Sequence, residues 1–519
     1  MSSPGQLPDF DRSFLPVVDD ALARHADRVW AIFGDQETTF AELDRRSAQV
    51  ANALIRDGFR PGDRGAVYST NSPVAFVVAL GTIRAGGIWV PVNPFNTLDT
   101  NVGLLDRFGC RVVFPGARFI ESVTEEVVPD ACAVRPLDGS LDDWLDGAAT
   151  TAPAVDRAGV DTVLLPQTGG TTGEPKGVML SHRNFVALSW AMEAGAAPDN
   201  VTLVAAPMTH VGGRHALASL AAGTTLVILD SVDIPAIFRA VERHRVTGFF
   251  LPPTAIYTLL DHPDLPGADL SSVRVLGYGS APMSMERLRE AFDKLGPIMS
   301  GGYGQTECPM AIARRAPADH FVDGDVTGDL LPDEQLRSVG RPTPLSRVAI
   351  LDDAGNEQPV GTPGEIAVKG PMVCEGYWEA PEETARIRLK GWHLTGDIGV
   401  FDEDGRLYIV DRKKDMIITG GFNVFSSEVE TALRQIDGVA DAAVIGVPDD
   451  QWGEAVTAFV VPAGGRVLDE ADVIAEARAS LGSVKAPKSV RFVDALPETT
   501  VGKVDKKALR TAAAEEAPR

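Results

Sequence analysis

One segment of the chain carries the residue types needed to bind phosphate groups. Residues 167–177 read Gln-Thr-Gly-Gly-Thr-Thr-Gly-Glu-Pro-Lys-Gly and follow the short apolar run 163–166. Glycines let backbone N–H groups approach an anion closely, threonines add hydroxyl donors, and a lysine adds positive charge. The segment is not a Walker A sequence, because a glutamate and a proline separate the last glycine from the lysine. We expect phosphate contacts from Thr168, Gly169, Gly170, Thr171, Thr172, Gly173 and Lys176. A flexible surface loop is the alternative.

A second segment combines an aromatic ring, a hydroxyl and a carboxylate. Residues 302–307 are Gly302, Tyr303, Gly304, Gln305, Thr306 and Glu307. Alone, this sequence is typical of a surface turn. Its position downstream of the first loop favours a functional interpretation.

The pattern of apolar runs predicts an α/β fold that would bring these segments together. Helices are expected at 41–56 and 74–85, and a strand at 65–68. Further strands are expected at 163–167, 203–206, 225–229, 248–251, 274–277 and 298–300. Short loops follow at 168–176, 207–213, 252–254, 278–282 and 301–307. Ligands in open α/β sheets bind beyond the carboxyl ends of the strands, so the pattern predicts one shared cleft.

Composition limits the class of protein. A chain of 519 residues suggests at least two domains, and 44% hydrophobic with 23% charged residues is ordinary for a globular protein. No apolar stretch is long enough for a membrane span, and the first residues do not resemble a secretory signal. The four cysteines lack metal-ligand or disulfide spacing, which favours a reducing, cytoplasmic setting. A net charge of −24 argues against nucleic acid as a partner.

Positive charge gathers near the C-terminus. Between 485 and 510 the chain has seven basic residues: Lys485, Lys488, Arg491, Lys503, Lys506, Lys507 and Arg510. A solvated helix and loop face is one interpretation, and a strip that meets phosphates is the other.

A second compositional unit begins near residue 412. The charged segment 411–415 separates candidate strands at 407–410 and 416–419. Apolar runs at 439–447 and 455–462, a helix near 470–481 and a strand at 490–493 follow, which is enough for a small α/β unit. Residues 512–519 are expected to fray.

These motifs, in this order, resemble the adenylate-forming superfamily, which contains acyl-CoA synthetases, nonribosomal-peptide adenylation domains and beetle luciferases. The resemblance runs from the segment 39–43 to Gly502 and Lys503, almost the whole chain. It implies an α/β fold with a large N-terminal domain of stacked sheets and a small, mobile C-terminal α+β domain. Family members often have serine where Gly169 stands, which removes one hydroxyl donor but leaves the backbone donors.

The resemblance also implies roles in ATP binding. The loop 168–176 would embrace the ATP phosphates, Tyr303 would stack on adenine, Thr306 would contact the α-phosphate and Glu307 would hold Mg²⁺. The segment of Gly279, Ser280, Ala281 and Pro282 would line the adenine site. Asp397 matches the ribose-binding aspartate, whose carboxylate can accept from both ribose hydroxyls, and Arg412 matches an arginine that also reaches the ribose.

Further residues would act on the acid and on CoA. Lys503 matches the catalytic lysine of the C-terminal loop, where a cation at developing phosphoryl charge contributes roughly 10²–10³ in rate. His210 falls where the family lines the acyl site, although a lone histidine is more often structural. Gly420 and Gly421 match the segment that faces the pantetheine arm of CoA, and the two glycines permit its close approach.

The resemblance implies residues 1–411 as the N-terminal domain with the ATP and acyl sites, and 412–519 as the mobile domain. The hinge would lie near Lys414. The expected activity is that of an acyl-CoA synthetase: a carboxylic acid and ATP give acyl-AMP, and CoA then gives acyl-CoA. Mg²⁺ is the expected metal.

Several alternatives stay open at this point. The chain could load an acyl carrier protein, perform only thioesterification, bind nucleotide without turnover, or oxidise a special acid as luciferases do. Glycines at 212–213, 277–279 and 301–302 suggest room for a medium, long or bulky acid, and Arg214 next to His215 is notable there. The sequence leaves open whether the acid is fatty, aryl or polycyclic. A homodimer is among the open oligomeric states.

Overall fold

The computed structural model describes residues 7–168, 175–449, 452–464, 466–497 and 504–515. The chain divides into two compact units. The first unit comprises Met1–Val348 and Val368–His393, and the second comprises Ala349–Ala367 and Leu394–Arg519. The predicted boundary at residue 412 and the hinge near Lys414 describe a rotation of the C-terminal domain, so this division into units does not test them.

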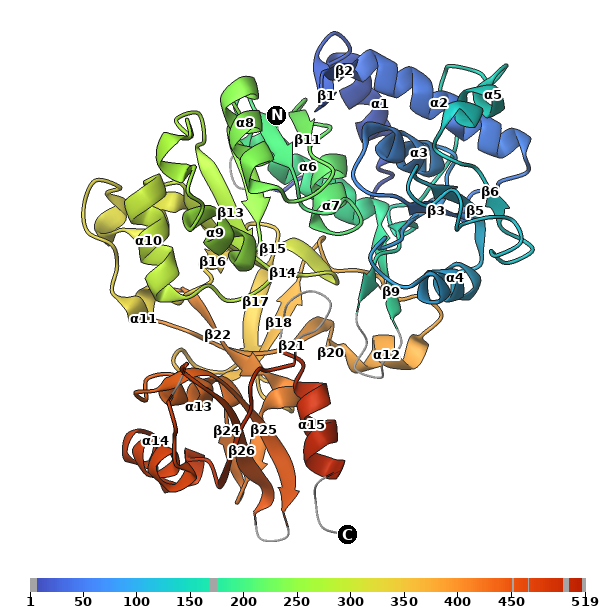
Figure 1. Ribbon diagram of the computed structural model, residues 1–519. Helices are drawn as coiled ribbons and strands as arrows, with labels where there is room; N and C mark the ends of the chain where they lie inside the picture. The colour runs from blue at the N-terminus through green and yellow to red at the C-terminus, as the bar shows by residue number, and fades with distance from the viewer. Residues whose placement is uncertain (1–6, 169–174, 450–451, 465, 498–503, 516–519) are drawn as a thin grey trace. The chain divides into compact units, whose positions relative to one another are not determined.

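A nine-stranded sheet forms one half of the first unit (Figure 1), in the order β16-β15-β14-β13-β12-β10-β11-β1-β2. Its strands from β1 through β14 pair in parallel, whereas β2, β15 and β16 are antiparallel to their neighbours. The bounds are β1 Val29–Phe33, β2 Gln36–Thr39, β10 Val201–Val204, β11 Thr225–Ile228, β12 Gly248–Leu251, β13 Val275–Gly279, β14 Met299–Gln305, β15 Cys308–Arg315 and β16 Arg341–Pro342.

Helices α8 (Ile234–His244), α9 (Pro253–Leu260) and α10 (Met285–Leu295) supply apolar residues to a core shared with this sheet. Helix α8 begins where Asp233 accepts a hydrogen bond from the Ala236 N–H (2.9 Å), a normal N-cap. Its buried residues recur at helical spacing, so one face packs on the sheet.

An eight-stranded sheet forms the other half of the first unit, in the order β19-β9-β7-β4-β3-β5-β6 with β8 beside β9. The bounds are β3 Arg64–Tyr68, β4 Ile88–Pro91, β5 Cys110–Pro115, β6 Ala133–Val134, β7 Thr162–Leu164, β8 Gln167–Thr168, β9 Lys176–Ser181 and β19 Gly376–Tyr377. Helices α2 (Phe40–Arg56) and α3 (Pro73–Arg84) lie against each other (Figure 1). A Cβ on Gly81 would come 2.4 Å from Val50, so only glycine allows this close helix packing.

The remaining helices of the first unit are α1 Leu15–Arg24, α4 Leu98–Arg107, α5 Gly139–Leu145, α6 His182–Gly195, α7 Val211–Ala218, α11 Asp333–Leu336 and α12 Pro381–Arg386. Short 3₁₀ turns occur at Leu265–Gly267, Pro317–His320 and Val322–Gly324. Among the described residues, no helix is both long enough and apolar enough to cross a membrane.

A five-stranded sheet in the order β17-β18-β21-β20, with β22 beside β21, follows in the chain. Its strands are β17 Arg347–Leu351, β18 Gly364–Lys369, β20 Arg388–Leu389, β21 Trp392–Phe401 and β22 Leu407–Arg412. The chain passes from one unit to the other within β17, β18 and β21. The 3₁₀ turn Lys413–Asp415 comes directly after β22.

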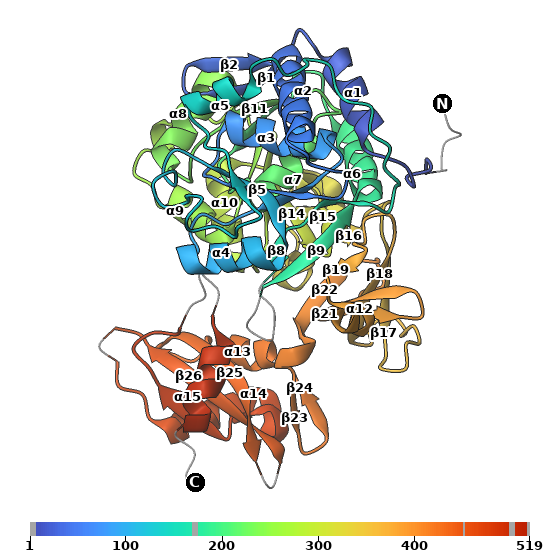
Figure 2. The same ribbon diagram turned by 90° about the vertical axis from the view of Figure 1, so that its right-hand side faces the viewer.

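The last sheet lies in the second unit, in the order β24-β23-β26-β25 with β27 beside β26. Its strands are β23 Ile417–Thr419, β24 Phe422–Val424, β25 Val439–Asp449, β26 Gly453–Pro462 and β27 Ser489–Phe492. Helices α13 (Ser426–Leu433) and α14 (Glu470–Lys485) share a core with Ala442 and Val444, whereas α15 (Lys506–Glu515) packs on Ala443 and Ile445 (Figure 2). Because side chains alternate along a strand, the helices cover opposite faces of β25.

The expected elements are all present, but two expectations about the loops were wrong. The expectation that the chain frays from residue 512 was also wrong for 512–515, because these residues end helix α15 and Ala513 is buried. The segments 278–282 and 301–307 begin as strand, because β13 runs to Gly279 and β14 to Gln305. A Cβ on Gly279 would lie 2.8 Å from the Gly302 carbonyl, so the glycines allow the two strands to approach closely. The loop 168–176 does not follow a strand of the nine-stranded sheet that contains β13 and β14. It joins the antiparallel pair β8 and β9 of the eight-stranded sheet.

A buried histidine anchors the start of α6, directly after β9. His182 has no exposed surface, and its Nδ1 accepts a hydrogen bond from the Phe14 N–H (3.1 Å). The proton of the neutral ring therefore resides on Nε2, which has no hydrogen-bond partner among the described residues. Burial, with the nearby Arg157 charge, lowers the pKa of His182 to about 4.

We predict that His182 makes stability fall as the solution is acidified. The unfolded state takes up this proton near pH 6.5 and the folded state only near pH 4, so the contribution is complete above pH 6.5 and is lost below it. Between about pH 7.5 and pH 5 the loss is about 2 kcal/mol. Urea unfolding of the full chain at both pH values measures it, and His182→Gln should show a shallower pH slope. Equal slopes for the two proteins would contradict this assignment.

Candidate active site

A short segment that the sequence analysis did not single out connects the two sheets of the first unit. We call residues 371–378 the strap. Its strand β19 pairs with β9, and the Trp378 N–H donates to the Gly177 carbonyl (2.8 Å). Toward the other sheet, the Cys374 N–H donates to the Glu307 carbonyl (2.8 Å). The strap therefore bridges the start of β9, which follows the predicted phosphate loop, and the end of β14.

Side chains at the start of α6 hold the strap in place. Asn184 donates to the carbonyls of Pro371 (2.7 Å) and Val373 (3.1 Å), and Arg183 forms an ion pair with Glu375 (2.7 Å). Asn184 also accepts from the Ser181 N–H (2.8 Å), which closes the first turn of the helix. The helix that follows β9 thus fixes the backbone of the strap.

Thr306 and Glu307 form the two-residue turn of the β14–β15 hairpin, which Gln305 and Cys308 close. This location explains why a strongly polar pair can project from a buried strand. The Tyr377 hydroxyl of the strap donates to Glu307 Oε1 (2.7 Å). Burial and the Glu307 charge raise the pKa of Tyr377, so the phenol stays protonated and keeps donating. The other carboxylate oxygen has no hydrogen bond within the described residues.

Lys176 lies on the other side of Tyr377. It is the first residue of β9 and pairs with Thr168 across β8. Its Nζ lies 5.3 Å from the centre of the Tyr377 ring and 4.0 Å from Glu383 Oε1. One tyrosine thus contacts both the lysine and the carboxylate that the sequence assigns to phosphate and metal.

His210 immediately precedes α7, and buried polar contacts fix the segment that leads to it. Asn71 accepts from the Met208 N–H (2.7 Å) and donates to the carbonyls of Ala206 (3.1 Å) and Leu229 (3.0 Å). The His210 ring hydrogen-bonds Thr209 (3.0 Å) and is exposed. Surrounding protein atoms, and then the Arg214 charge, lower the pKa of His210, which favours the neutral ring at neutral pH.

The predicted adenine segment contains a backbone outlier. Ser280 has φ +67°, a conformation that is uncommon for residues other than glycine. Ala281 is half-buried, whereas Ser280 and Pro282 are exposed. Tyr303, in β14, is only 7% exposed, so little of its ring is open to a base in this conformation. Its stacking on adenine stays a prediction.

Most glycines near the predicted acyl pocket are explained by packing. Cβ atoms on Gly212 and Gly213 would come 2.4 Å and 2.0 Å from the carbonyls of Ala206 and Met208. By contrast, nothing lies within 4 Å of the Cβ position of Gly302. The expectation that these glycines together leave room for the acid is therefore wrong for Gly212 and Gly213, and Gly302 is the one beside open space.

In the second unit, the two predicted ribose ligands contact each other. Asp397 and Arg412 are directly opposite in β21 and β22, and Arg412 Nε lies 2.8 Å from Asp397 Oδ1. The Asp397 side chain is 2% exposed and that of Arg412 is 51% exposed. A ribose hydroxyl that reached this carboxylate would share it with the guanidinium.

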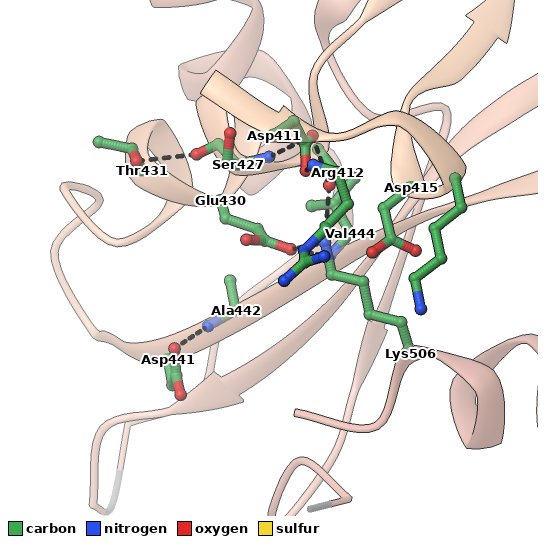
Figure 3. Close-up of polar contacts among 12 residues, drawn as sticks. Asp411, Arg412, Asp415, Ser427, Glu430, Thr431, Asp441, Ala442, Val444 and Lys506 are labelled. Carbon is green, nitrogen blue, oxygen red and sulfur yellow. Dashed lines mark hydrogen bonds and ion pairs between the residues drawn. The ribbon is translucent and has the colours of Figure 1, made fainter. Parts of the chain in front are cut away.

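Polar contacts fix both ends of the predicted hinge segment 411–415, and Figure 3 shows the end at Asp411. The buried Asp411 accepts from Ser426 Oγ (2.8 Å) and the Ser427 N–H (3.2 Å) at the start of α13. Asp415 forms an ion pair with Arg510 of α15 (2.7 Å). The exposed Lys414 lies between these anchored carboxylates.

Gly420 and Gly421 form the two-residue turn between β23 and β24, where Thr419 pairs with Phe422. Their φ values of +57° and +81° are those of a type I′ hairpin turn. The turn geometry alone therefore favours glycine at both positions. The predicted approach of the CoA thiol arm is an additional and untested reason.

Most basic residues near the C-terminus bind groups of their own unit. Lys506 pairs with Glu430 (2.7 Å), and Lys485 pairs with Glu428 (2.6 Å). Lys488 donates to three carbonyls at the end of α14. These contacts favour the interpretation of this strip as a structural face.

Gly169, Gly170, Thr171, Thr172, Gly173 and Lys503 lie outside the described residues. The ends of both loops are described, however. Thr168 pairs with Lys176, and the Asp505 N–H donates to the Pro497 carbonyl (2.7 Å). Both candidate phosphate loops are therefore closed at their bases.

No group of three or more His, Cys, Asp or Glu side chains that could hold a metal occurs among the described residues. A metal at Glu307 would therefore take its other ligands from water and substrate. Mg²⁺ is often bound in this way, through one or two carboxylates and the phosphates of a nucleotide. The second oxygen of Glu307 suits such a metal.

We predict that Tyr377→Phe raises the Mg²⁺ concentration needed for adenylation about 10–100-fold, because a group that orients a metal ligand is lost. Pyrophosphate exchange into ATP, titrated with Mg²⁺, measures the effect. Tyr408→Phe is a matched control, since Tyr408 donates a similar hydrogen bond to Asp402 (3.0 Å). An unchanged Mg²⁺ dependence in Tyr377→Phe would contradict the proposed role of the Glu307–Tyr377 pair.

The sequence matches two family models over most of its length. Residues 18–378 match the model of AMP-binding enzymes, and residues 428–503 match the model of the AMP-binding enzyme C-terminal domain. The chain is 36% identical to a medium/long-chain-fatty-acid–CoA ligase of Mycobacterium tuberculosis, over 94% of this chain and 88% of that protein. It is 37% identical to a feruloyl-CoA synthase of Amycolatopsis, over 95% and 97% of the two chains.

A solved structure has the same fold. ATP-bound MatB from Rhodopseudomonas palustris aligns with a TM-score of 0.83 at 34% identity, over 95% of this chain and 98% of that one. The similarity confirms the adenylate-forming fold, with a large N-terminal domain and a small C-terminal domain. The chain belongs to the AMP-binding enzyme family.

Proposed function

We propose that this AMP-forming acid–CoA ligase activates a medium- or long-chain fatty acid or an aryl acid. The similar proteins from Mycobacterium and Amycolatopsis act on acids of these two kinds. In the first step a carboxylate oxygen attacks the α-phosphorus of ATP, which gives acyl-AMP and releases pyrophosphate. In the second step the CoA thiol attacks the acyl carbon, AMP leaves, and the thiol proton passes to solvent.

The observation that carries the proposal is the contact of Tyr377 with both Lys176 and Glu307. Adenylation concentrates negative charge on the phosphates, so fixed cations and a metal are what the site must supply. Lys176 would bind the phosphates together with the loop 168–174. Glu307 would hold Mg²⁺, which supplies charge neutralisation, and Thr306 in the same turn would contact the α-phosphate.

The second unit would supply the remaining groups. Asp397 and Arg412 would bind the ribose, and Lys503 would stabilise the charge that develops during adenylation. The turn of Gly420 and Gly421 would face the pantetheine arm of CoA after a rotation about Lys414. Such a rotation would let one cleft serve both half-reactions.

Mass spectrometry of the products tests this function. The full chain would be incubated with ATP, Mg²⁺, CoA and separate fatty, aryl and polycyclic acids. We expect an acyl-CoA whose formation requires ATP, and a roughly 10²–10³-fold slower adenylation in Lys503→Ala. Acyl-AMP that accumulates and transfers only to a carrier protein, or thioester formed only from synthetic acyl-AMP, would overturn the proposal in favour of a loading or a thioesterification-only enzyme.

We predict that a larger side chain at position 302 narrows the acyl pocket. Gly302→Val adds a side chain beside open space, so it should lower kcat/KM for aryl acids at least tenfold more than for butyrate, through steric clash. Gly248→Ala is a control in the same sheet, where a Cβ would meet the Val275 carbonyl at 3.3 Å and the Val275 Cβ at 3.9 Å. Equal losses for both acids in Gly302→Val would place Gly302 outside the acyl pocket.

A further inference from the structure

One half-buried cation of the first unit has a buried nitrogen without a partner. Arg214 lies on α7 four residues after His210, so the two residues lie on the same side of the helix start. Its Nε is buried without a hydrogen-bond partner, and the guanidinium forms no ion pair with the described residues. Every other arginine with a buried, unpartnered Nε among the described residues, namely Arg84, Arg157 and Arg183, forms an ion pair.

The buried Nε–H of Arg214 is costly to keep. A buried donor without an acceptor loses its hydrogen bonds to water and gains none in return. Burial lowers the pKa of Arg214 to about 10, and the Glu307 charge opposes the shift. The side chain is therefore still a cation at neutral pH. Tyr377 already occupies one oxygen of Glu307, and that carboxylate is the proposed metal ligand, so it does not neutralise Arg214 during the reaction.

The backbone around Arg214 cannot easily move to relieve this cost. A Cβ on Gly213 would come 2.0 Å from the Met208 carbonyl and 2.6 Å from the Trp89 ring, so the first turn of α7 is tightly packed. The Asn71 side chain accepts a hydrogen bond from the Met208 N–H, which fixes this segment of backbone. Trp89 is itself buried and its Nε1–H has no acceptor among the described residues. Two buried donors thus belong to elements that touch at Gly213.

Building on the proposed function, we propose that Arg214 binds an oxygen acceptor on the acyl chain of the substrate, separate from the carboxylate that is activated. A guanidinium offers five donors in a planar fork, which fits a carbonyl, a hydroxyl or a second carboxylate. The preferred acids are therefore oxygenated acids, and a plain hydrocarbon chain leaves the donors unsatisfied. Sites that hydrogen-bond a substrate reject analogues without the group more strongly than apolar pockets discriminate by size.

Matched acids of equal chain length test this inference. Octanoate, 7-oxooctanoate and octanedioate would be compared by kcat/KM for acyl-CoA formation, with the wild type and Arg214→Met. We expect the wild type to prefer at least one oxygenated acid over octanoate by about ten- to hundredfold. The preference should collapse in Arg214→Met. Arg214→Lys should keep part of a preference for octanedioate, because it retains the charge but not the fork.

Arg243→Met serves as a control, since Arg243 is 62% exposed and pairs with Asp35 at the surface. It should keep the wild-type preference. Equal turnover of all three acids by the wild type would overturn the inference while leaving the ligase function intact. A raised KM for ATP in Arg214→Met with an unchanged acid preference would overturn it too, because Arg214 would then bind phosphate. Absence of any thioester from these acids and from the fatty and aryl panel would refute the function itself.

Discussion

The hydrogen bond from Tyr377 to Glu307 is the contact on which the arrangement of the first unit depends. The predicted phosphate loop joins two strands of the eight-stranded sheet, whereas Glu307 belongs to a hairpin of the nine-stranded sheet. The strap joins them, because its backbone pairs with β9 and its Cys374 N–H holds the Glu307 carbonyl (2.8 Å). A tyrosine placed between a lysine and a carboxylate then sets their separation.

In the second unit, hydrogen bonds and ion pairs hold the residues around the predicted hinge. Asp411 and Asp415 are tied to α13 and α15, and Asp397 is paired with Arg412. A domain that rotates as a rigid body needs a firmly built segment on each side of a small number of pivoting residues. Both helices, α13 and α15, belong to residues 412–519, so a rotation about Lys414 would have to break the contacts of Asp411 with α13, and the pivot stays a prediction. Gly420 and Gly421 form the turn between β23 and β24, and they are also the residues predicted to face the pantetheine arm of CoA.

Much of this organisation could be predicted from sequence. Periodicity located α2, α3 and the strands around β12, and the motif order identified the family and its two-domain fold. The strap was missed because Gly376 and Tyr377 form a strand too short for a periodic pattern, and their partners are 70 or more residues away. The ion pair of Asp397 with Arg412 was also missed, since it depends on strand register. The glycines of α7 were misread because sequence does not distinguish a glycine beside a ligand from one pressed against a carbonyl.

Arg214 illustrates a further limit. Its position beside His210 is visible in the sequence, but only the structure shows that its Nε is buried with no acceptor in the described chain. That difference turns an ordinary helix arginine into a candidate determinant of which acid the enzyme accepts. The chemistry of activation is shared across the family, whereas the acid is chosen by individual side chains such as this one.

A crystal structure of the protein with Mg²⁺ and a non-hydrolysable ATP analogue would test the central claim most directly. The account predicts a metal on the second oxygen of Glu307, with the Tyr377 hydroxyl still on the first and Lys176 at a phosphate. A metal bound elsewhere, or a Tyr377 that has left Glu307 to contact the nucleotide, would contradict the role given to the strap.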